Sequence, residues 1–350
     1  MANFFYFDQT GQRQGPLNES QVKQLAMQGI IRPSTSIETD TGRKGTAGQI
    51  PGLFPVEPNP FVIAPRSSVQ SGIVTLTKTT VDYCDFIHPE DEIALNRLKA
   101  VPGLQTVTKW MMSNLTETFF HGLYMATRIR LSPTQLPKIY NLLPPICRKF
   151  GIEEPEFYLE MNPAPNAYTF GDTRTFLTIT SGLLSHVKND EELIAVLAHE
   201  CGHILCRHVL YKTMAHFIAD VITSIGMVGK LAMPIKYALR YWSRRSEYSA
   251  DRAELVYLGD SIPVLGVLTR LAGGPAEITG NINFEEYADQ AKYYLDLQND
   301  SRRHQLFQTL AVMDSSHPFS SVRAHEILKW EKSEQYQRLR VALNKNDNRL

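Results

Sequence analysis

The sequence predicts an α+β protein, in which a mainly helical domain with a small antiparallel sheet follows a smaller α+β domain. Helical patterning predominates over residues 76–350. One extended region, residues 157–181, interrupts it, and there Leu177 and Ile179 alternate with threonines at strand spacing. Five prolines fall within residues 51–65, which marks a boundary between the two parts.

The proline cluster divides the chain into three segments. We expect a domain over residues 1–54, a stiff linker over residues 55–72 and a larger domain over residues 73–350. No internal repeat with a period of about 20 to 50 residues is visible, so a solenoid is not expected.

The first domain shows a recognisable order of elements. An aromatic strand at Phe4–Phe7 is followed by turns at Gly11 and Gly15-Pro16, then by an amphipathic helix over about Ser20–Met27. This order resembles the small GYF-like domains found at the N-termini of bacterial multidomain proteins. GYF domains that bind proline-rich ligands use a tryptophan and a Gly-Tyr-Phe triplet, which this segment lacks. We therefore expect the fold without polyproline binding, and three roles stay open: recruitment of a protein partner, inhibition or simple tethering.

Composition and charge exclude several classes of protein. The chain has 43% hydrophobic and 21% charged residues, which supplies a sizeable core and argues against disorder. Lys+Arg and Asp+Glu both number 36, so no net charge favours a nucleic-acid partner. The four cysteines show no metal-knuckle spacing and are too few for a disulfide framework, which indicates a reducing compartment and mostly buried thiols.

No run of apolar residues is long enough for a conventional membrane-spanning helix. The most apolar region, residues 217–235, is interrupted by Asp220 and Lys230. The first residues lack the pattern of a secretory signal, so a cytoplasmic protein is expected. Residues 217–242 are apolar with basic residues towards their end, which leaves two alternatives: a buried helix pair over the functional site, or peripheral contact with a membrane surface.

The segment that ends at His203 carries the clearest chemistry. Asn189 is a good helix N-cap, and Glu192 three residues later completes a capping box. On this helix His199 and His203 are four residues apart, so both imidazoles project from one face and can hold one metal ion. With Glu200 they form the H-E-x-x-H arrangement, in which a glutamate serves as general base beside zinc. The alternative is a charged helix face that binds nothing.

A catalytic zinc site needs a third protein ligand and one open position. Metzincins place a glycine and a histidine where this chain has Cys206 and Val209, so that class is excluded. A carboxylate from a second helix remains, and Glu247 supplies it. Asp251, one turn later, is placed to accept the free N–H of a metal-bound histidine, the alternative being a solvated salt-bridge face with neighbouring arginines. His208, beyond the pentad on the first helix, is expected either to buttress the site or, preferably, to be structural.

These motifs together resemble a known family. Three motifs and one arginine occur in the order found in one group of enzymes: H-E-C-G-H at 199–203, E-Y-S-A-D-R at 247–252, Ser-His-Pro at 316–318 and then Arg323. The group is the HtpX-like and CAAX-prenyl-protease-related zinc metallopeptidases, metallopeptidase family 48 of the gluzincins. The resemblance runs over about residues 90–330. Because the spanning helices of membrane-embedded members are missing, it points to a soluble branch.

The resemblance implies a function for the central residues. One zinc ion per chain would be held by His199, His203 and Glu247. Zinc lowers the pKa of a bound water to about 7, and Glu200 would accept the water proton and deliver it to the leaving amine. The chain is therefore expected to be a zinc-dependent metalloendopeptidase. The alternative is a latent or non-catalytic zinc protein acting as a chaperone-like or adaptor module, against which the intact Glu200 argues.

Further expectations concern the substrate. The resemblance implies a substrate strand along Asn166, Ala167 and Tyr168. Backbone pairing gives affinity with little sequence preference, so unfolded or extended polypeptide is the expected substrate class. His317 and Arg323 are implied to act near the metal, and two roles for His317 stay open: a hydrogen bond to the oxyanion, or a latch in the open metal position. Replacing His317 by alanine would lower turnover in the first case and raise it in the second.

Overall fold

The computed structural model divides the chain into two units, Met1–Val74 and Thr75–Leu350, which are taken separately below. The described residues are 4–7, 12–27, 30–31, 35–40, 44–47, 50, 53, 81–114, 117–172, 174–217, 229–300 and 319–347. The predicted linker over residues 55–72 lies outside them.

The first unit is a four-stranded antiparallel sheet with one helix, in the strand order β2-β1-β3-β4. Its elements are β1 (Phe4–Phe7), β2 (Arg13–Leu17), α1 (Glu19–Met27), β3 (Ser36–Thr39) and β4 (Lys44–Thr46). The predicted strand and helix are both present, and Val22 of the helix packs with Ile31 and Ile37 in a small core. Gly15-Pro16, predicted as a turn, instead lies within β2, an edge strand that tolerates the missing N–H of proline. The turn predicted at Gly11 lies outside the described residues.

The second unit is predominantly helical. Its first half contains η2 (Tyr83–Asp85), α2 (Pro89–Lys99), α3 (Leu104–Asn114), α4 (Glu117–Thr127), β5 (Ile129–Arg130), α5 (Pro137–Tyr140), α6 (Leu143–Phe150), β6 (Glu156–Glu160), β7 (Ala167–Gly171) and β8 (Thr175–Thr180). Its second half contains α7 (Ser181–His186), α8 (Asp190–Leu205), α9 (Val209–Phe217), α11 (Gly229–Leu258), α12 (Ile262–Gly273), α13 (Ala276–Thr279), α14 (Phe284–Asp300), α16 (Ser320–Glu331) and α17 (Glu334–Asp347). The predicted mainly helical α+β class is confirmed for this unit.

The sheet of the second unit has the strand order β5-β6-β8-β7, which leaves β7 at one edge. β7 and β8 form an antiparallel pair, as predicted. β6 and β8 are parallel, so the prediction of a purely antiparallel sheet is wrong. The reason is topological, because the chain passes from β6 to the outer strand β7 and returns between the two as β8. Residue alternation within a strand indicates which side chains share a face and carries no information on this order.

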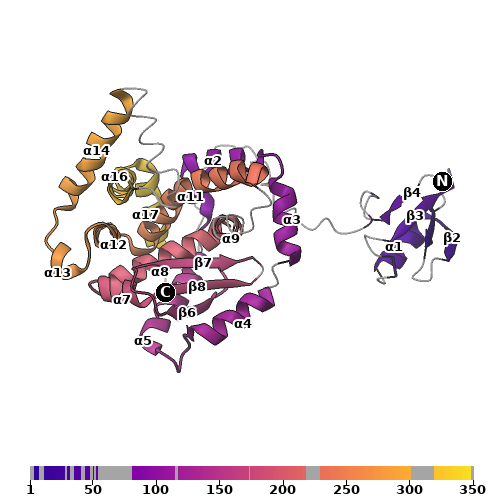
Figure 1. Ribbon diagram of the computed structural model, residues 1–350, viewed down its shortest axis with the longest axis horizontal. Coiled ribbons are helices and arrows are strands. Elements are labelled where there is room, and N and C mark those ends of the chain that lie inside the picture. The colour runs from indigo at the N-terminus through magenta and orange to yellow at the C-terminus, as the bar shows by residue number, and fades with distance from the viewer. Residues whose placement is uncertain are drawn as a thin grey trace. The chain divides into compact units, whose positions relative to one another are not determined.

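Helices cover both faces of this sheet, with α8 above the strands and α4 below them in Figure 1. On the α4 face, Tyr124 packs against Tyr158 and Phe176. On the opposite face, Phe157 and Leu177 belong to the large core that also contains the apolar residues of α8. Neighbouring residues of one strand thus point to opposite layers, as strand geometry requires.

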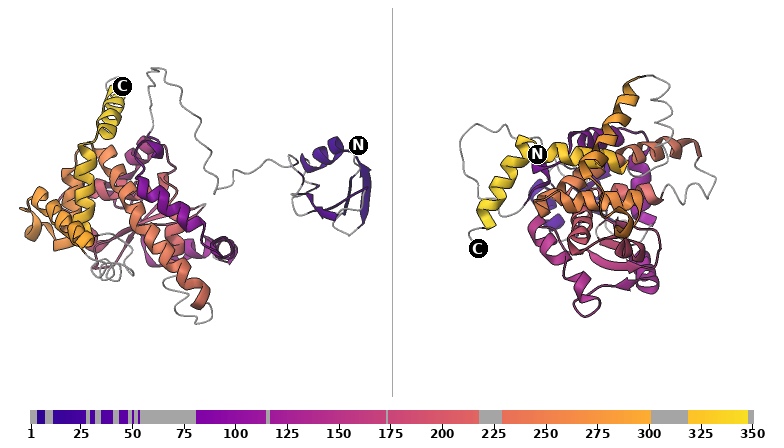
Figure 2. Two further views of the ribbon diagram at one scale, coloured as in Figure 1. Left: turned by 90° about the horizontal axis from the view of Figure 1, so that it is seen from above. Right: turned by 90° about the vertical axis from the view of Figure 1, so that its left-hand side faces the viewer.

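Close contact between α8 and α11 fixes the centre of this unit. A Cβ added at Gly202 of α8 would lie 2.6 Å from the Cβ of Ala253 on α11, so only glycine allows this approach. α16 packs against α11 and α12, and Figure 2 shows α14 alongside α16. The polar residues of α8 and α11 therefore meet inside the unit rather than at its surface.

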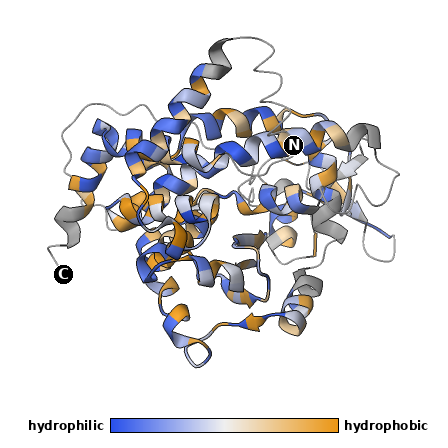
Figure 3. Cartoon of the chain, turned by 60° about the vertical axis from the view of Figure 1, so that its left-hand side comes forward, coloured by the Kyte–Doolittle hydropathy of each residue, from blue (hydrophilic) through white to orange (hydrophobic). Residues whose placement is uncertain are grey.

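Within the described residues, no single helix combines the length and the apolar composition needed to cross a membrane. α8 and α9 reach both only when taken together, and they are bent by 101° at their junction. Residues 218–228, part of the segment with two predicted alternatives, lie outside the described residues. Figure 3 shows hydrophilic and hydrophobic residues alternating along the helices, the pattern of amphipathic helices around a core.

Candidate metal centre

The helix α8 begins as the sequence predicts and carries the two histidines into the core. The Oδ1 atom of Asn189 accepts a hydrogen bond from the backbone N–H of Glu192, the predicted N-cap. The reciprocal half of the capping box is absent, because the Glu192 carboxylate instead accepts from the N–H of Lys188 and pairs with Arg270. This buried ion pair anchors the start of α8 against α12.

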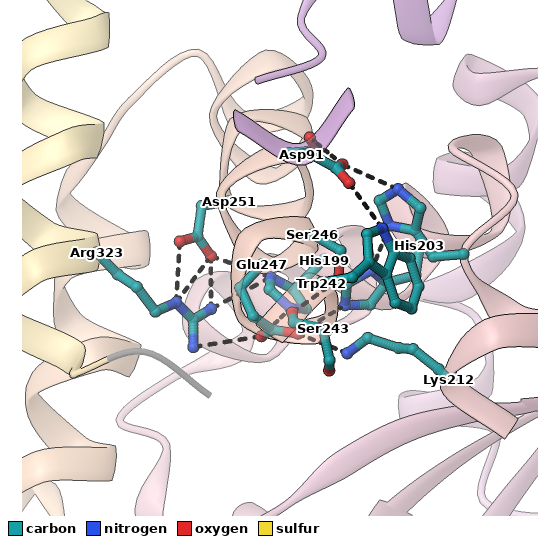
Figure 4. Close-up of polar contacts among 12 residues, drawn as sticks. Asp91, His199, His203, Lys212, Trp242, Ser243, Ser246, Glu247, Asp251 and Arg323 are labelled. Carbon is teal, nitrogen blue, oxygen red and sulfur yellow. Dashed lines mark hydrogen bonds and ion pairs between the residues drawn. The ribbon is translucent and has the colours of Figure 1, made fainter. Parts of the chain in front are cut away.

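A carboxylate from α11 meets the two histidines of α8, as Figure 4 shows. The Nε2 atom of His199 lies 3.3 Å from Oε2 of Glu247, and the Nε2 atom of His203 lies 3.3 Å from Oε1 of the same residue. All three side chains are buried, and their ligand atoms lie within 4.8 Å of one another. The structure thus brings together the three residues that the sequence predicts as ligands.

The chemistry of these side chains fits a zinc ion. Nε2 of His203 and Oε2 of Glu200 are buried, and neither has a hydrogen-bond partner among the described residues. Two imidazole nitrogens and one carboxylate are the donor set of many catalytic zinc sites. Burial alone would lower the pKa of His199, but hydrogen bonds to Asp251, Glu247 and other carboxylates raise it well above its usual value. The carboxylates around His199 therefore favour a positive charge among them.

A second acidic residue, which the sequence analysis missed, lies behind His199. Oε1 of Glu254 is 2.6 Å from Nδ1 of His199, closer than Oδ1 of Asp251 at 3.2 Å. Burial raises the pKa of Glu254 to about 7. Glu247, Asp251 and Glu254 are spaced i, i+4 and i+7 along α11, so they share one helix face. That spacing was a signal in the sequence for the third acidic residue.

Arg323 of α16 reaches the same acidic face. Its Nε and Nη2 atoms donate to Asp251 at 2.9 Å and 2.5 Å, and Nη1 lies 3.6 Å from Oε2 of Glu247. Burial alone would lower the pKa of Arg323, but the charge of Asp251 raises it above its usual value. The structure thus places Arg323 beside the carboxylates of α11, and its guanidinium offsets their charge.

Lys212 of α9 lies on the other side of the centre and was not predicted from the sequence. Its Nζ donates to Oε1 of Glu247 at 2.5 Å, and its side chain is mostly buried. Burial, together with the ammonium charge of Lys212, holds the pKa of His203 well below its usual value. His203 is therefore neutral, the form in which imidazole binds a metal.

A cavity of about 250 Å³ opens beside these residues. Asn166 and Ala167, two of the three predicted substrate-strand residues, line it together with Glu200. The third, Tyr168, donates a hydrogen bond from its hydroxyl to Glu160 at 2.5 Å. β7, to which Ala167 and Tyr168 belong, is one of the two edge strands of the sheet.

The far end of β7 is held by α9. The hydroxyl of Thr213 accepts from the backbone N–H of Gly171 at 3.0 Å and donates to the carbonyl of Gly171 at 3.1 Å. Asn166 accepts at its carbonyl from the N–H of Thr180, so the backbone groups of Ala167 point away from β8 by the alternation of antiparallel pairing. At the cavity, β7 therefore presents the backbone N–H and carbonyl of Ala167 away from β8 and beside the candidate metal centre.

Three predictions about other residues have different outcomes. His317 lies outside the described residues. α8 ends at Leu205, so His208 does not continue the metal helix as predicted but lies in the turn before α9. Cys201, one of the four cysteines expected to be mostly buried thiols, is fully buried, and burial raises its pKa.

The centre combines two histidines four residues apart on one helix, a glutamate beside them and a carboxylate from a second helix. This combination defines a zinc-dependent metallopeptidase. The chain belongs to peptidase family M48, whose model matches residues 134–331. Members of this family use zinc, so the protein is a zinc metalloprotease that hydrolyses polypeptides.

Named relatives agree with this assignment. The chain is 31% identical over 268 residues to the plastoglobule-localized metallopeptidase 48, chloroplastic, of Arabidopsis thaliana, an alignment that covers 76% of this chain and 77% of the relative. It is 25% identical over 256 residues to a protease HtpX homolog of Nostoc sp., covering 66% of this chain and 86% of the relative. A protease HtpX homolog of Pelotomaculum thermopropionicum is 35% identical over 105 residues, covering 29% of this chain and 37% of the relative.

Proposed function

We propose that this metalloprotease is an endopeptidase acting on unfolded or extended polypeptides, with His199, His203 and Glu247 as its zinc ligands and Glu200 as general base. The observation that carries the proposal is the meeting of three ligand atoms within 4.8 Å beside a cavity that Glu200 also lines. A bound zinc ion would supply Lewis acidity and a nucleophilic water at neutral pH.

The residues of the chain account for the remaining steps. Glu200, whose Oε2 is buried without a hydrogen-bond partner among the described residues, accepts a proton from the attacking water and delivers it to the leaving amine. Glu254 and Asp251 hold the Nδ1 side of His199, so its Nε2 points to the metal. Arg323 neutralises Asp251 and is a positioning residue in this arrangement.

The edge of β7 supports the assignment of the substrate class. Ala167 lies at the cavity with its backbone N–H and carbonyl directed away from β8. An extended polypeptide can pair with these groups as an added strand, which provides affinity without strong sequence preference. A folded substrate has its backbone groups already paired, so unfolded chains are favoured.

We also propose two roles outside the catalytic centre. Residues 1–54 form a GYF-like docking domain for a protein partner, which the four-stranded sheet with one helix supports.

The first half of α11 makes peripheral contact with a membrane surface, because Met233 and Tyr241 are exposed there beside basic residues. Sedimentation with anionic vesicles tests the second role, and wild-type binding that equals that of Met233→Ser would exclude it. The cytoplasmic location stays a prediction.

The proposed function is tested by hydrolysis of an unfolded protein. Zinc-loaded wild type and Glu200→Gln are compared, with bound zinc measured in both. Cleavage by wild type alone, at equal zinc content, supports Glu200 as the base. Zinc in both proteins with no cleavage in either favours the latent or non-catalytic alternative and directs the next experiment to His317.

A further inference from the structure

A chain of buried polar side chains runs from the metal centre to α2. Nδ1 of His203 lies 2.9 Å from Nδ1 of His208, and Nε2 of His208 lies 3.0 Å from Oδ2 of Asp91. All three side chains are at most 1% exposed. Figure 4 shows Asp91 on the far side of the imidazoles from Glu247. The far nitrogen of His203 thus connects to a carboxylate that is distant in sequence.

The direction of the hydrogen bonds in this chain follows from the hydrogen-bonding capacity of each group. A carboxylate can only accept, so Nε2 of His208 carries hydrogen and donates to Asp91. Of the two Nδ1 atoms that face each other, one carries hydrogen and the other accepts, and with Nδ1 of His208 as the acceptor the donors run in one direction from His203 to Asp91. Nδ1 of His203 therefore carries its hydrogen, and Nε2 of His203 presents a lone pair towards Glu247 and the metal position.

Asp91 is itself held in place by two residues of α11. Nε1 of Trp242 donates to Oδ1 at 3.1 Å, and the hydroxyl of Ser249 donates to Oδ2 at 2.6 Å. Burial alone would raise the pKa of Asp91, but His208 and these two donors hold it below its usual value. The Asp91 carboxylate is thus an anion that accepts hydrogen bonds from Trp242, Ser249 and His208. Helix α11 carries two of these donors and also the proposed ligand Glu247.

We propose that Asp91 and His208 are positioning residues that fix His203 as a metal ligand by setting its tautomer and ring orientation. The inference rests on the proposed function only in taking His203 as a ligand. Asp91 lies upstream of residues 134–331, the part of the chain that matches the family. Partners of this kind on the far nitrogen of a ligand histidine typically contribute about 10- to 100-fold to metal affinity.

The test replaces His208 in two ways. His208→Leu removes the acceptor for His203, whereas His208→Gln keeps a carbonyl to accept from His203 and an amide to donate to Asp91. Zinc dissociation constants are measured by competition with a chromophoric chelator. We expect His208→Leu to weaken zinc binding about tenfold or more and His208→Gln to stay within about threefold of wild type.

A matched control separates positioning from general stability. Glu192→Gln neutralises a buried carboxylate on the same helix as His203, in the ion pair with Arg270. It should lower the melting temperature of the metal-free protein and leave the zinc dissociation constant unchanged. Asp91→Asn is the second test variant, because its amide oxygen can still face His208 while the negative charge is lost. It should weaken zinc binding by an amount between those of the two His208 variants.

The outcomes are distinguishable. If His203→Ala abolishes zinc binding while His208→Leu and Asp91→Asn both keep the wild-type affinity, the positioning role is wrong and the metal centre stands. If His203→Ala binds zinc as tightly as wild type, the proposed ligand set is wrong and the inference is overturned with it. Should His208→Leu not fold, Asp91→Asn decides, since a wild-type zinc affinity in that variant overturns the proposal.

Discussion

Lys212 and Glu247 form a direct ion pair at the metal centre, with Nζ of the lysine 2.5 Å from Oε1 of the glutamate. The carboxylate is fully buried, so an unbalanced charge there would be costly. With Glu247 as a zinc ligand, as proposed, the lysine and a zinc ion would compete for the same carboxylate. Lys212 would then stabilise the metal-free protein and oppose the binding of metal.

Replacing Lys212 by methionine should destabilise the metal-free protein by about 3–5 kcal/mol, because Glu247 loses its nearest cation. The same change should tighten zinc binding by about tenfold, since a unit charge a few ångströms away no longer repels the ion. Urea unfolding of the metal-free protein and chelator competition measure the two effects. Lys212→Arg keeps the charge and is the control. Equal zinc affinity in wild type and Lys212→Met would contradict the competition.

Gly202 is predicted to be essential for the packing of α8 against α11. Gly202→Ala places a Cβ 2.6 Å from that of Ala253, and the resulting displacement of the helices should cost about 1–3 kcal/mol and weaken zinc binding. The matched control is Gly122→Ala in α4, where an added Cβ has no atom within 4 Å. That variant should gain about 0.5–1 kcal/mol from higher helix propensity. Thermal unfolding with and without zinc distinguishes the two sites.

Ala167→Pro tests the substrate strand. Proline removes the outward N–H of Ala167 and leaves the pairing with β8 intact, because that N–H does not point to β8. Loss of one hydrogen bond to substrate should lower kcat/KM for an unfolded protein about two- to tenfold, with zinc content unchanged. Ala167→Val keeps the N–H and should cleave faster than Ala167→Pro. Equal values of kcat/KM in the two variants would exclude pairing at this position.

The stability of the protein should depend on pH through Glu326. The side chain of His88, whose Nε2 lies 3.7 Å from Oε2 of Glu326, lowers the pKa of Glu326 from 4.5 to about 2. Because the pKa in the folded state is lower, this contribution is complete above pH 4.5 and is lost as pH falls towards 2. Glu326→Gln should therefore cost about 2–3 kcal/mol of unfolding free energy at pH 7 and almost nothing at pH 2. Urea unfolding of the variant and wild type at both pH values measures the difference.

An exposed carboxylate provides the control for this measurement. Glu334 pairs with Arg338, and both side chains are more than 80% exposed. Glu334→Gln should therefore leave the unfolding free energy unchanged at both pH values. A Glu326→Gln effect that is the same at pH 7 and pH 2 would show that the loss comes from packing rather than from the charge.

The sequence predicts those parts of the centre that depend on residues close together in the chain. His199 and His203 are four residues apart on one helix, and Glu247 and Asp251 are four apart on another, so helical periodicity places each pair on one face. Glu254 lies three residues beyond Asp251 and continues the Glu247–Asp251 spacing, so the sequence also allows its prediction as a residue of the centre. The helix start at Asn189 follows from local capping preferences.

Other features depend on how separate elements pack, which local patterns do not contain. Asp91 of α2 and Lys212 of α9 reach the centre only because their helices lie against α11. The parallel pairing of β6 with β8 depends on the order of strands in the sheet. The turn before α9 separates His208 from the metal helix, although periodicity would continue α8 through it.

The hydroxyl of Thr213 bonds both outward backbone groups of Gly171 and would thereby limit the length of the proposed substrate edge. Only Ala167 and Thr169 remain on β7 with outward backbone groups ahead of that point, so an added strand has two pairing positions before it must leave the sheet. Two pairing positions would supply few hydrogen bonds, so products bound along this edge are expected to dissociate readily. The protease should therefore act non-processively: it should release the substrate after each cleavage and produce fragments of widely varying length.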